Sequence, residues 1–249
     1  MKVLFIILLG ITLGFGDEVT KKYINYLQHL PAKTKKYRFK QLVLPPIQKV
    51  DLELRKLYLE TLNNIQNNKN KQKIDHLMKI YQTNDPIDLL KRIKPHPISI
   101  TLAQAAIESA WATSRFFIEA NNIFGMWTRS TSKEDAIAAG SKRANGRVIY
   151  LKRYKSLEDS VRHYYKTLAT RDAYKHFREI RYISNDPLEI ASYLDQYSEQ
   201  DYYYTVSIIK VIMKNNFTQY DRAPLPILEI KKAPSDANAS LEALNQKKI

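Results

Sequence analysis

A single acidic residue stands in an otherwise uncharged and largely apolar segment, ISITLAQAAIESAW, at residues 98–111. Apolar side chains occur nearly all round a helix with this sequence, which predicts a helix buried in the centre of a domain. Its one charged residue is Glu108. Burial raises the pKa of a carboxyl group, and a carboxyl group that keeps its proton suits a general acid for glycoside cleavage. Spacing alone equally fits a Glu108 that lies at the helix rim and binds Arg115 or a backbone amide.

Other familiar catalytic patterns are absent from the sequence. Only three glycines follow residue 16, and they are too scattered for a phosphate-binding loop. None of the five histidines forms a ligand pair at helical spacing, and no GxSxG motif occurs. The chain has no cysteine, which excludes thiolate nucleophiles and disulfides. We therefore expect neither a metal site nor a cofactor.

The composition indicates a basic, exported, globular protein. Hydrophobic residues make up 44% and charged residues 26% of the 249 residues, with a formal net charge of +15. The charge fits either an anionic partner or a solvated basic surface. Residues 1–16 combine a lysine, an apolar core and small residues near the end, which is typical of a secretory signal peptide; an uncleaved N-terminal anchor is the alternative.

Export narrows the choice of partner and location. We expect a periplasmic or cell-wall-associated protein with no stable membrane span once residues 1–16 are removed. Nucleic acid is a poor partner for an exported protein, even a basic one. The bacterial cell wall, which carries carboxylates, is the leading anionic partner.

The hydrophobic pattern predicts a mostly helical α+β domain with one small β-hairpin. Helical periodicity extends from about residue 51 to 82, interrupted at residues 63–73 by a polar helix–helix connection or a frayed end. A helix with Asp85 as its N-cap is expected to begin at residue 86, and one that begins at Ser156 is expected to carry Leu157, Val161, Tyr164 and Leu168 on one face. Further helices are expected at 98–111, 172–182, 187–197 and 201–215. Within residues 17–48, Pro31, Pro45 and Pro46 are expected to interrupt any long helix. Asn145-Gly146 before an apolar run predicts a hairpin turn.

Several ordered motifs carry a resemblance to a known family. The pattern P-x-x-x-x-L-A-Q-A-A-I-E-S-A-W-x-x-S-R-F covers residues 97–116, and NNIFGMW follows at residues 121–127. Further matching segments are residues 153–161, then Tyr174, Phe177 and Arg178, then residues 197–199 and Tyr204. Over roughly residues 90–218 the chain resembles the bacterial peptidoglycan glucosaminidases (glycoside hydrolase family 73), and more narrowly their Bax-like branch.

The resemblance implies a lysozyme-like fold and hydrolysis of the β-1,4 bond after N-acetylglucosamine in peptidoglycan glycan strands. It places the family's catalytic acid on Glu108 and its cleft tyrosine on Tyr204. Substrate-binding residues are expected at Asn122, Phe124, Gly125 and Trp127, with Trp111 as an apolar wall beside the acid. Without the resemblance, Trp127 and Tyr204 would read as core aromatics.

The implied organisation has four parts. They are a signal peptide at 1–16, a basic helical extension at 17–90, the catalytic domain at 91–220 and a flexible tail at 221–249. The role of the extension and any protein partner stay unassigned by the sequence.

Two departures from the family pattern bear on the mechanism. Ala110 and Ala112 stand where the family often has glycine, so the turn after the catalytic helix is expected to differ. Many members carry a second acid in the β-lobe, whereas here the lobe holds only Glu134 and Asp135, early in the lobe. Asp135 is the candidate second acid, with a solvated loop as its alternative. With a second carboxylate the reaction could be inverting or retaining, depending on the separation of the two groups, and without one the 2-acetamido group of the substrate could serve as nucleophile.

Three other functions fit the same residues. A muramidase or a lytic transglycosylase can also use one glutamate on a lysozyme-like scaffold. A non-catalytic wall-binding or assembly protein fits the missing second acid and the basic extension. Nucleic-acid binding would rest on the net charge alone.

Overall fold

Helices make up most of the protein in the computed structural model, which describes residues 17–142, 148–198 and 202–228. The helices are α2 (Asp17–His29), α3 (Ala32–Gln66), α4 (Lys71–Tyr81), α5 (Pro86–Ile93), α6 (Ile98–Glu108), α7 (Arg115–Ala120), α8 (Leu157–Thr170), α9 (Lys175–Ile183), α10 (Pro187–Ala191) and α11 (Tyr202–Lys214), and the strands are β1 (Trp127–Thr128), β2 (Ala136–Lys142) and β3 (Val148–Lys152). The expected mostly helical α+β fold with a small β-lobe is confirmed.

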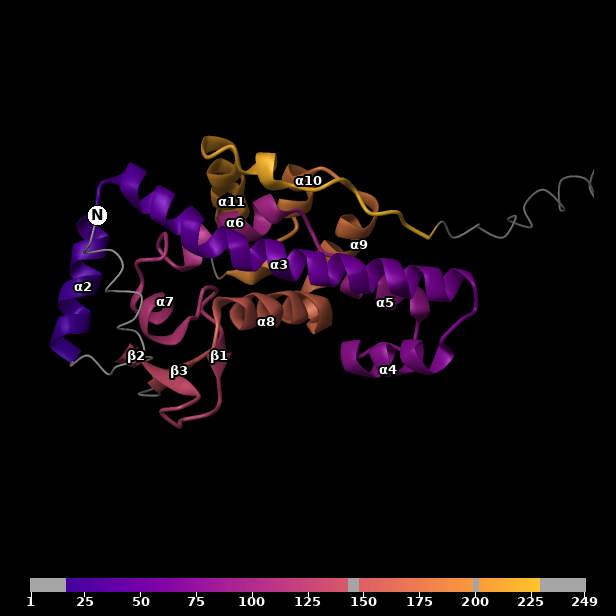
Figure 1. Ribbon diagram of the computed structural model, residues 1–249, viewed down its shortest axis with the longest axis horizontal. Coiled ribbons are helices and arrows are strands. Elements are labelled where there is room, and N and C mark those ends of the chain that lie inside the picture. Colours follow the sequence, from indigo (N-terminus) through magenta and orange to yellow (C-terminus); the bar gives the residue numbers. More distant parts are fainter. Residues whose placement is uncertain (1–16, 143–147, 199–201, 229–249) are drawn as a thin grey trace, which may run out of the picture.

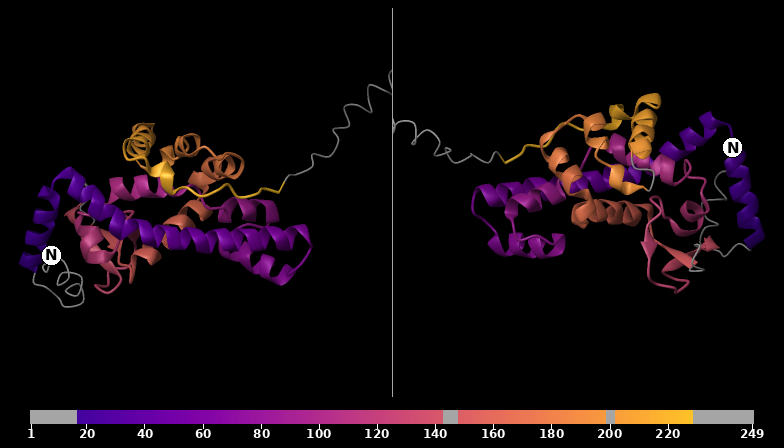
Figure 2. Two further views of the ribbon diagram at one scale, coloured as in Figure 1. Left: turned by 45° about the horizontal axis from the view of Figure 1, so that its top comes forward. Right: turned by 180° about the vertical axis from the view of Figure 1, so that it is seen from behind.

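The 35-residue helix α3 runs along most of the molecule, with α2 near one end and α4 near the other (Figures 1 and 2). It packs against α5, α6 and α8. Phe39, Val43, Ile47 and Val50 of α3 are fully buried in the same apolar cluster as the residues of α6. The basic extension therefore shares one core with the helix that carries Glu108.

The expectation that Pro45 and Pro46 interrupt a long helix is wrong, because both lie inside α3. Each proline removes one backbone hydrogen bond and so weakens the helix at this point. Val43 and Ile47, on either side of the pair, are completely buried, and Pro46 is buried with them. Tertiary packing of this apolar face outweighs the local preference. The boundary expected at Pro31 is correct, since α3 begins directly after it.

Helix α6 occupies the centre of the fold, as its all-round apolar sequence predicts. Every residue from Ile98 to Ala106 is buried, and α3, α11 and the 3-10 helix η4 (Phe217–Tyr220) pack around it. The helix ends at Glu108, three residues before the expected end. The one acidic residue of the segment thus stands at the helix C-terminus, where the buried interior gives way to the surface.

Three consecutive non-glycine residues with positive φ form the turn after α6: Ala110 (φ 50°), Trp111 (φ 62°) and Ala112 (φ 61°). The Trp111 N–H donates to Ala106 O (2.8 Å) and the Ala110 N–H to Ile107 O (3.2 Å). This pair of bonds defines a Schellman helix end, whose left-handed position usually holds glycine. The family's glycines thus coincide with positions that are left-handed here, and the alanines adopt that conformation at some cost.

Side chains hold this strained turn from two directions. The Ser109 hydroxyl accepts the Ala112 N–H (2.9 Å), and the Arg38 guanidinium on α3 donates to Ala112 O (2.7 Å). The Trp111 ring packs edge-on against Phe39 of α3, with centroids 5.2 Å apart. Helix α3 therefore fixes the segment that follows α6.

The β-lobe is an antiparallel three-stranded sheet with strand order β1-β3-β2. Trp127 of β1 pairs with Leu151 of β3, and Ile137 of β2 pairs with the same residue from the other side. The antiparallel β2–β3 pair agrees with the expected hairpin, although the Asn145-Gly146 turn lies outside the described residues.

Two buried arginines on α9 join the ends of neighbouring helices. The Arg178 guanidinium donates to Leu168 O (3.0 Å) and Arg171 O (2.7 Å) at the end of α8. The Arg181 guanidinium donates to Lys91 O (2.7 Å) and Arg92 O (3.1 Å) at the end of α5. Helix C-termini carry partial negative charge, which these cations complement.

The expected helix starts at Asp85 and Ser156 are confirmed. The Asp85 carboxylate accepts the N–H groups of Ile87 and Asp88, and the Ser156 hydroxyl accepts the N–H of Asp159. Both are N-caps that satisfy amides left free at a helix start. No helix among the described residues is both long enough and apolar enough to cross a membrane.

The segment after Asp221 differs from the expected loose tail as far as residue 228. Leu225 is buried against the cluster formed by α3, α4 and α5. The Tyr58 hydroxyl donates to Pro226 O (2.6 Å), and the Leu228 N–H donates to the Tyr182 hydroxyl (2.9 Å). Residues 229–249 lie outside the described part of the chain.

The left-handed turn gives a stability prediction. Replacing exposed Ala110 with glycine removes the steric penalty of positive φ and should raise the free energy of unfolding by about 1 kcal/mol. Ala173→Gly is the matched control, because Ala173 is exposed in a right-handed 3-10 turn and should lose stability. Urea unfolding of both variants measures the difference; equal destabilisation by both would contradict the account of the turn.

Candidate active site

The carboxyl group of Glu108 lies at the end of α6 and is hydrogen-bonded to a tyrosine from α11. The Tyr204 hydroxyl donates to Glu108 Oε1 at 2.8 Å. Burial raises the pKa of the Glu108 carboxyl above its usual value, while the hydrogen bond from Tyr204 acts in the opposite direction. Arg115, the alternative partner, pairs with Glu119 instead. The structure therefore places Glu108 and Tyr204 together.

A chain of buried side chains determines which way the Tyr204 proton points. Gln104, one turn before Glu108 on α6, donates from Nε2 to the Tyr204 hydroxyl at 3.0 Å. Gln104 Oε1 in turn accepts a hydrogen bond from the Tyr164 hydroxyl of α8. With its amide oriented in this way, Gln104 supplies a donor to Tyr204, which leaves the single phenol proton for Glu108.

The hydrogen-bonded chain continues inward from Tyr164. Its hydroxyl lies 3.0 Å from His96 Nε2, and the Thr101 hydroxyl lies 2.9 Å from the same nitrogen and 2.9 Å from the Tyr165 hydroxyl. Burial holds the pKa of His96 well below its usual value, so the ring is neutral. A neutral buried network of this kind fixes side-chain positions without adding charge near Glu108.

The segment at residues 122–126 borders the other side of the carboxyl group. A Cβ added to Gly125 would lie 3.8 Å from Glu108 Oε2, so this glycine faces the carboxyl directly. Its φ of +66° also favours glycine. Asn122 closes the turn, because its amide donates to Met126 O and Lys152 O and accepts from Met126 N–H, each at 2.9 Å. Asn122 thus shapes the segment from within.

Stacked aromatic rings support both sides of the carboxyl group. Phe124 stacks on Tyr164 with ring centroids 4.1 Å apart, and Tyr197 stacks on Tyr204 at 5.5 Å. The Tyr197 hydroxyl donates to Phe124 O (3.3 Å) and so ties the two stacks together. Burial raises the pKa of Tyr174 and of Tyr197, and ionisation of Glu108 would raise both further, which places both phenols in its vicinity.

The two tryptophans occupy different environments. Trp111 packs between Phe39 of α3 and Phe217 of η4, with Lys36 over its ring, which favours a structural role for it. Trp127, on the edge strand β1, is 58% exposed. Its position on the β-lobe directly after the 122–126 segment leaves it available to a ligand.

Asp135 lies in an exposed turn before β2, where its carboxylate accepts from the Ser132 hydroxyl (3.2 Å). The Asp135 N–H donates to the Ser132 hydroxyl, and the Asp135 carbonyl accepts from the Arg153 N–H. Within residues 17–142, 148–198 and 202–228, no carboxylate contributes to the pKa of Glu108. Glu199, part of the motif resemblance, lies outside these ranges. The structure thus does not bring Asp135 to Glu108.

Two residues that orient the Tyr204 hydroxyl, Gln104 and Tyr164, were not predicted as site residues. Gln104 lay in the quoted motif but carried no assigned role, and Tyr164 read as one of four residues on an apolar helix face. The signal in the sequence was Gln104, which stands four residues before Glu108 inside an apolar helix. A buried amide needs partners, so it predicts a polar network at that position.

With this geometry in view, the comparisons define the class of protein. Residues 84–217, more than half of the chain, match the family Glucosaminidase, described as mannosyl-glycoprotein endo-beta-N-acetylglucosaminidase. The chain belongs to this family, as the motifs predict. The matched residues include Glu108, Tyr204 and the segment at residues 122–126, whereas α3 lies outside the match.

Individual relatives match parts of the chain. It is 33% identical over 93 residues to Protein bax from Escherichia coli strain K12, covering 37% of this chain and 31% of that protein. The match thus spans less than a third of that relative's length.

Two solved structures show weaker similarity. The autolysin Auto catalytic domain from Listeria monocytogenes has a TM-score of 0.46 and 18% identity, covering 84% of this chain and 99% of that chain. A peptidoglycan hydrolase from Sphingomonas sp. A1 has a TM-score of 0.38 and 18% identity, covering 64% and 94%. Both TM-scores are low, and the family assignment is independent of them.

The buried carboxyl group makes a stability prediction with a defined sign. Because folding raises the pKa of Glu108, the protein loses stability as pH rises from the unfolded pKa through the folded pKa. Glu108→Gln stays neutral and can still accept from Tyr204. At pH 7 it should melt higher by roughly 2–4 °C, the shift that about 1 kcal/mol produces at this size. The gain should vanish near pH 4, and calorimetry at both pH values measures it; a lower melting temperature at pH 7 would contradict the raised pKa.

Proposed function

We propose that this protein hydrolyses the β-1,4-glycosidic bond after N-acetylglucosamine in peptidoglycan, with Glu108 as general acid. The observation that carries the proposal is the buried Glu108 carboxyl, whose pKa burial raises and whose Oε1 accepts a hydrogen bond from Tyr204, at the end of a buried helix in a glucosaminidase-family domain. Peptidoglycan as the substrate is supported by the motif resemblance to cell-wall glucosaminidases and by the net charge of +15, which suits an anionic wall.

Tyr204 assists the acid by contacting the oxygen whose charge changes. When Glu108 gives its proton to the leaving sugar oxygen, negative charge develops on the carboxylate. The Tyr204 hydroxyl, already donating to Oε1, stabilises that charge. Gln104 and Tyr164 are positioning residues, since they act on the carboxyl only through Tyr204.

The second step of the reaction is assigned to the substrate itself. Asp135 lies in an exposed turn, and its carboxylate accepts a hydrogen bond from the Ser132 hydroxyl. Among the described residues, no hydrogen bond joins it to Glu108. An acetamido oxygen on the reacting sugar can attack its own anomeric carbon and replace a protein nucleophile. The proposal is thus a substrate-assisted hydrolysis in which Glu108 is first general acid and then general base.

The sugar chain is held by exposed aromatic side chains on β1 and α11, which are the strand after the 122–126 segment and the helix that carries Tyr204. Trp127 is 58% exposed, and Tyr202 and Tyr203, next to Tyr204 in the chain, are 70% and 76% exposed. Aromatic rings of this kind stack on the apolar faces of sugars. Gly125 keeps the space beside Glu108 Oε2 free of a side chain, which allows a substrate oxygen to approach. A cell-wall substrate places the protein outside the cytoplasm.

Glu108→Gln tests the acid, and Asp135→Asn is its matched control. Removing the ionisable proton should lower wall lysis at least about 100-fold, the usual contribution of a general acid. Asp135→Asn should keep most of the activity, because its turn survives on the backbone contacts. Purified sacculi digested by each protein and analysed by mass spectrometry supply the measurement.

The products of the same digestion distinguish the chemistries. Fragments with a reducing N-acetylglucosamine end support the proposal. Reducing muramic acid would make the protein a muramidase, and anhydro-muramic acid a lytic transglycosylase. Binding to sacculi without released fragments would make it a wall-binding protein. A fully active Glu108→Gln variant would refute the role of the acid.

A pH profile tests the part played by Tyr204. Tyr204→Phe removes the hydrogen bond that lowers the pKa of Glu108, so the alkaline limb of kcat should move to higher pH. The rate should fall by about tenfold, because the developing carboxylate loses its donor. Gln104→Met should shift the limb in the same direction while leaving KM nearly unchanged. An unmoved limb in both variants would show that the buried chain has only a structural role.

A further inference from the structure

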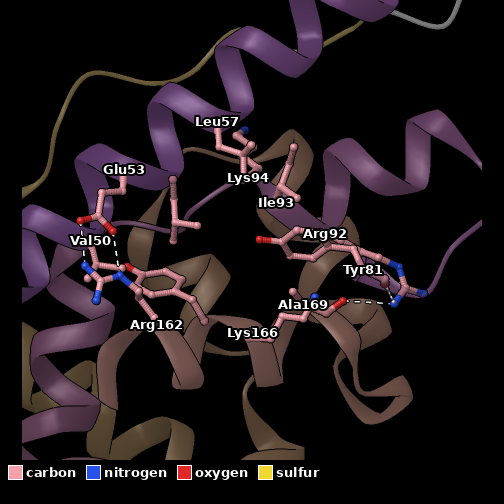
Figure 3. Close-up of a pocket in the computed structure, with 12 residues that line it drawn as sticks. Val50, Glu53, Leu57, Tyr81, Arg92, Ile93, Lys94, Arg162, Lys166 and Ala169 are labelled. Atoms are coloured by element: carbon pink, nitrogen blue, oxygen red, sulfur yellow. Dashed lines mark hydrogen bonds and ion pairs between the residues drawn. The ribbon is translucent and has the colours of Figure 1, made fainter. Parts of the chain in front are cut away.

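A pocket lies between the extension helix α3 and the helices α5 and α8, away from Glu108 (Figure 3). Its volume is about 320 Å³, in the range of small-molecule sites. None of its lining residues belongs to the group around Glu108. They come from α3 (Val50, Glu53, Leu54, Leu57), the end of α4 (Tyr81), the end of α5 and its C-cap (Arg92, Ile93, Lys94) and α8 (Arg162, Tyr165, Lys166, Ala169).

The pocket lining combines aliphatic and cationic side chains. Val50, Leu54 and Leu57 of α3 present aliphatic side chains, whereas α5 and α8 supply Arg92, Lys94, Arg162 and Lys166. Figure 3 shows the α3 residues on one side of the space and Arg92, Lys166 and Ala169 on another. The arrangement suits a ligand with an apolar body and a charged head.

Positive charge exceeds negative charge in the lining. Its one carboxylate, Glu53, is already bound to Arg162 through two 2.9 Å hydrogen bonds. Lys166 lies over the Tyr81 ring, 3.6 Å from its centroid, and its ammonium group donates to Ile80 O. Lys94 donates to Tyr182 O at 2.7 Å. No carboxylate of the described residues influences the pKa of Lys94 or of Lys166.

Burial makes this excess charge unusual. Lys94 is 5% exposed and Arg181 is 1% exposed, and no carboxylate of the described residues influences the pKa of either group. Burial and the neighbouring arginines lower the pKa of Lys94 to about 8. Cations withdrawn from water without counter-ions are destabilising, and a bound anion relieves that penalty.

We propose that this pocket binds a small organic anion, with a carboxylate or phosphate head near Lys166 and an apolar body against α3. Arg92 is already paired with Asp88 at 2.6 Å and contributes to the positive potential of the pocket. The site is independent of glycoside hydrolysis and bridges the extension to the catalytic domain. Its ligand therefore stabilises the packing of α3 on α8, because it contacts both helices.

Octanoate, octyl phosphate and neutral octanamide are suitable probes for the full-length protein, with isothermal titration calorimetry and thermal shift as readouts. At least one anion should bind and raise the melting temperature, while octanamide binds at least about tenfold more weakly. The stronger of octanoate and octyl phosphate identifies the head group. Absence of binding by both anions, or equal binding by octanamide, would overturn the proposal.

Lys166→Gln should weaken anion binding about tenfold by removing one charged donor, and Lys166→Arg should restore it. Lys79→Gln is the matched control, because Lys79 is exposed on α4 and does not line the pocket. Equal losses in Lys166→Gln and Lys79→Gln would refute the site. Glu108→Gln should bind the anion like the unmodified protein, so the result stands apart from the test of hydrolysis.

Discussion

The hydrogen bond from Tyr204 to Glu108 sets the constraint on which the rest of the structure depends. A carboxyl group withdrawn from water tends to keep its proton, and a phenol donor partly reverses that tendency. The balance between the two needs a fixed distance and a fixed proton direction. Gln104 supplies both, since its amide donates to Tyr204 while Tyr164 occupies its oxygen. The site is therefore a buried chain of neutral groups with one acid at its surface end.

Helix α3 extends this constraint to the N-terminal part of the chain. Its Arg38 binds the carbonyl of Ala112, and its Phe39 packs on Trp111, so it holds the turn that follows Glu108. The same helix buries Val43 and Ile47 in the core shared with α6. The extension is thus a structural part of the unit that carries Glu108. The C-terminal half of α3 forms one wall of the pocket between α3, α5 and α8.

The left-handed turn after α6 shows how packing sustains local strain. Alanine at positive φ is unfavourable, yet Ala110 and Ala112 both adopt it. The Schellman bonds and the Ser109 hydroxyl satisfy the backbone groups that end the helix. The strain next to Glu108 persists because the surrounding contacts determine the backbone conformation from several sides.

Much of the fold followed from sequence, and so did the residue that we propose as the acid. The all-round apolar pattern of residues 98–111 was enough to predict a central helix, and Glu108 is its one charged residue. The caps at Asp85 and Ser156 gave two helix starts, because capping depends only on neighbouring amides. Ordered motifs identified the family, and through it Tyr204.

Tertiary structure decided what local pattern could not. Pro45 and Pro46 remain helical because distant side chains bury the helix face around them, and a short window contains no information on those partners. Gln104 and Tyr164 become a single network only when α6 and α8 meet across 60 residues of chain. Whether Asp135 reaches the acid was likewise a question of distance between segments. The sequence by itself determined which groups could carry the chemistry, whereas packing decided which of them touch, because contacts between remote residues arise only when the core forms.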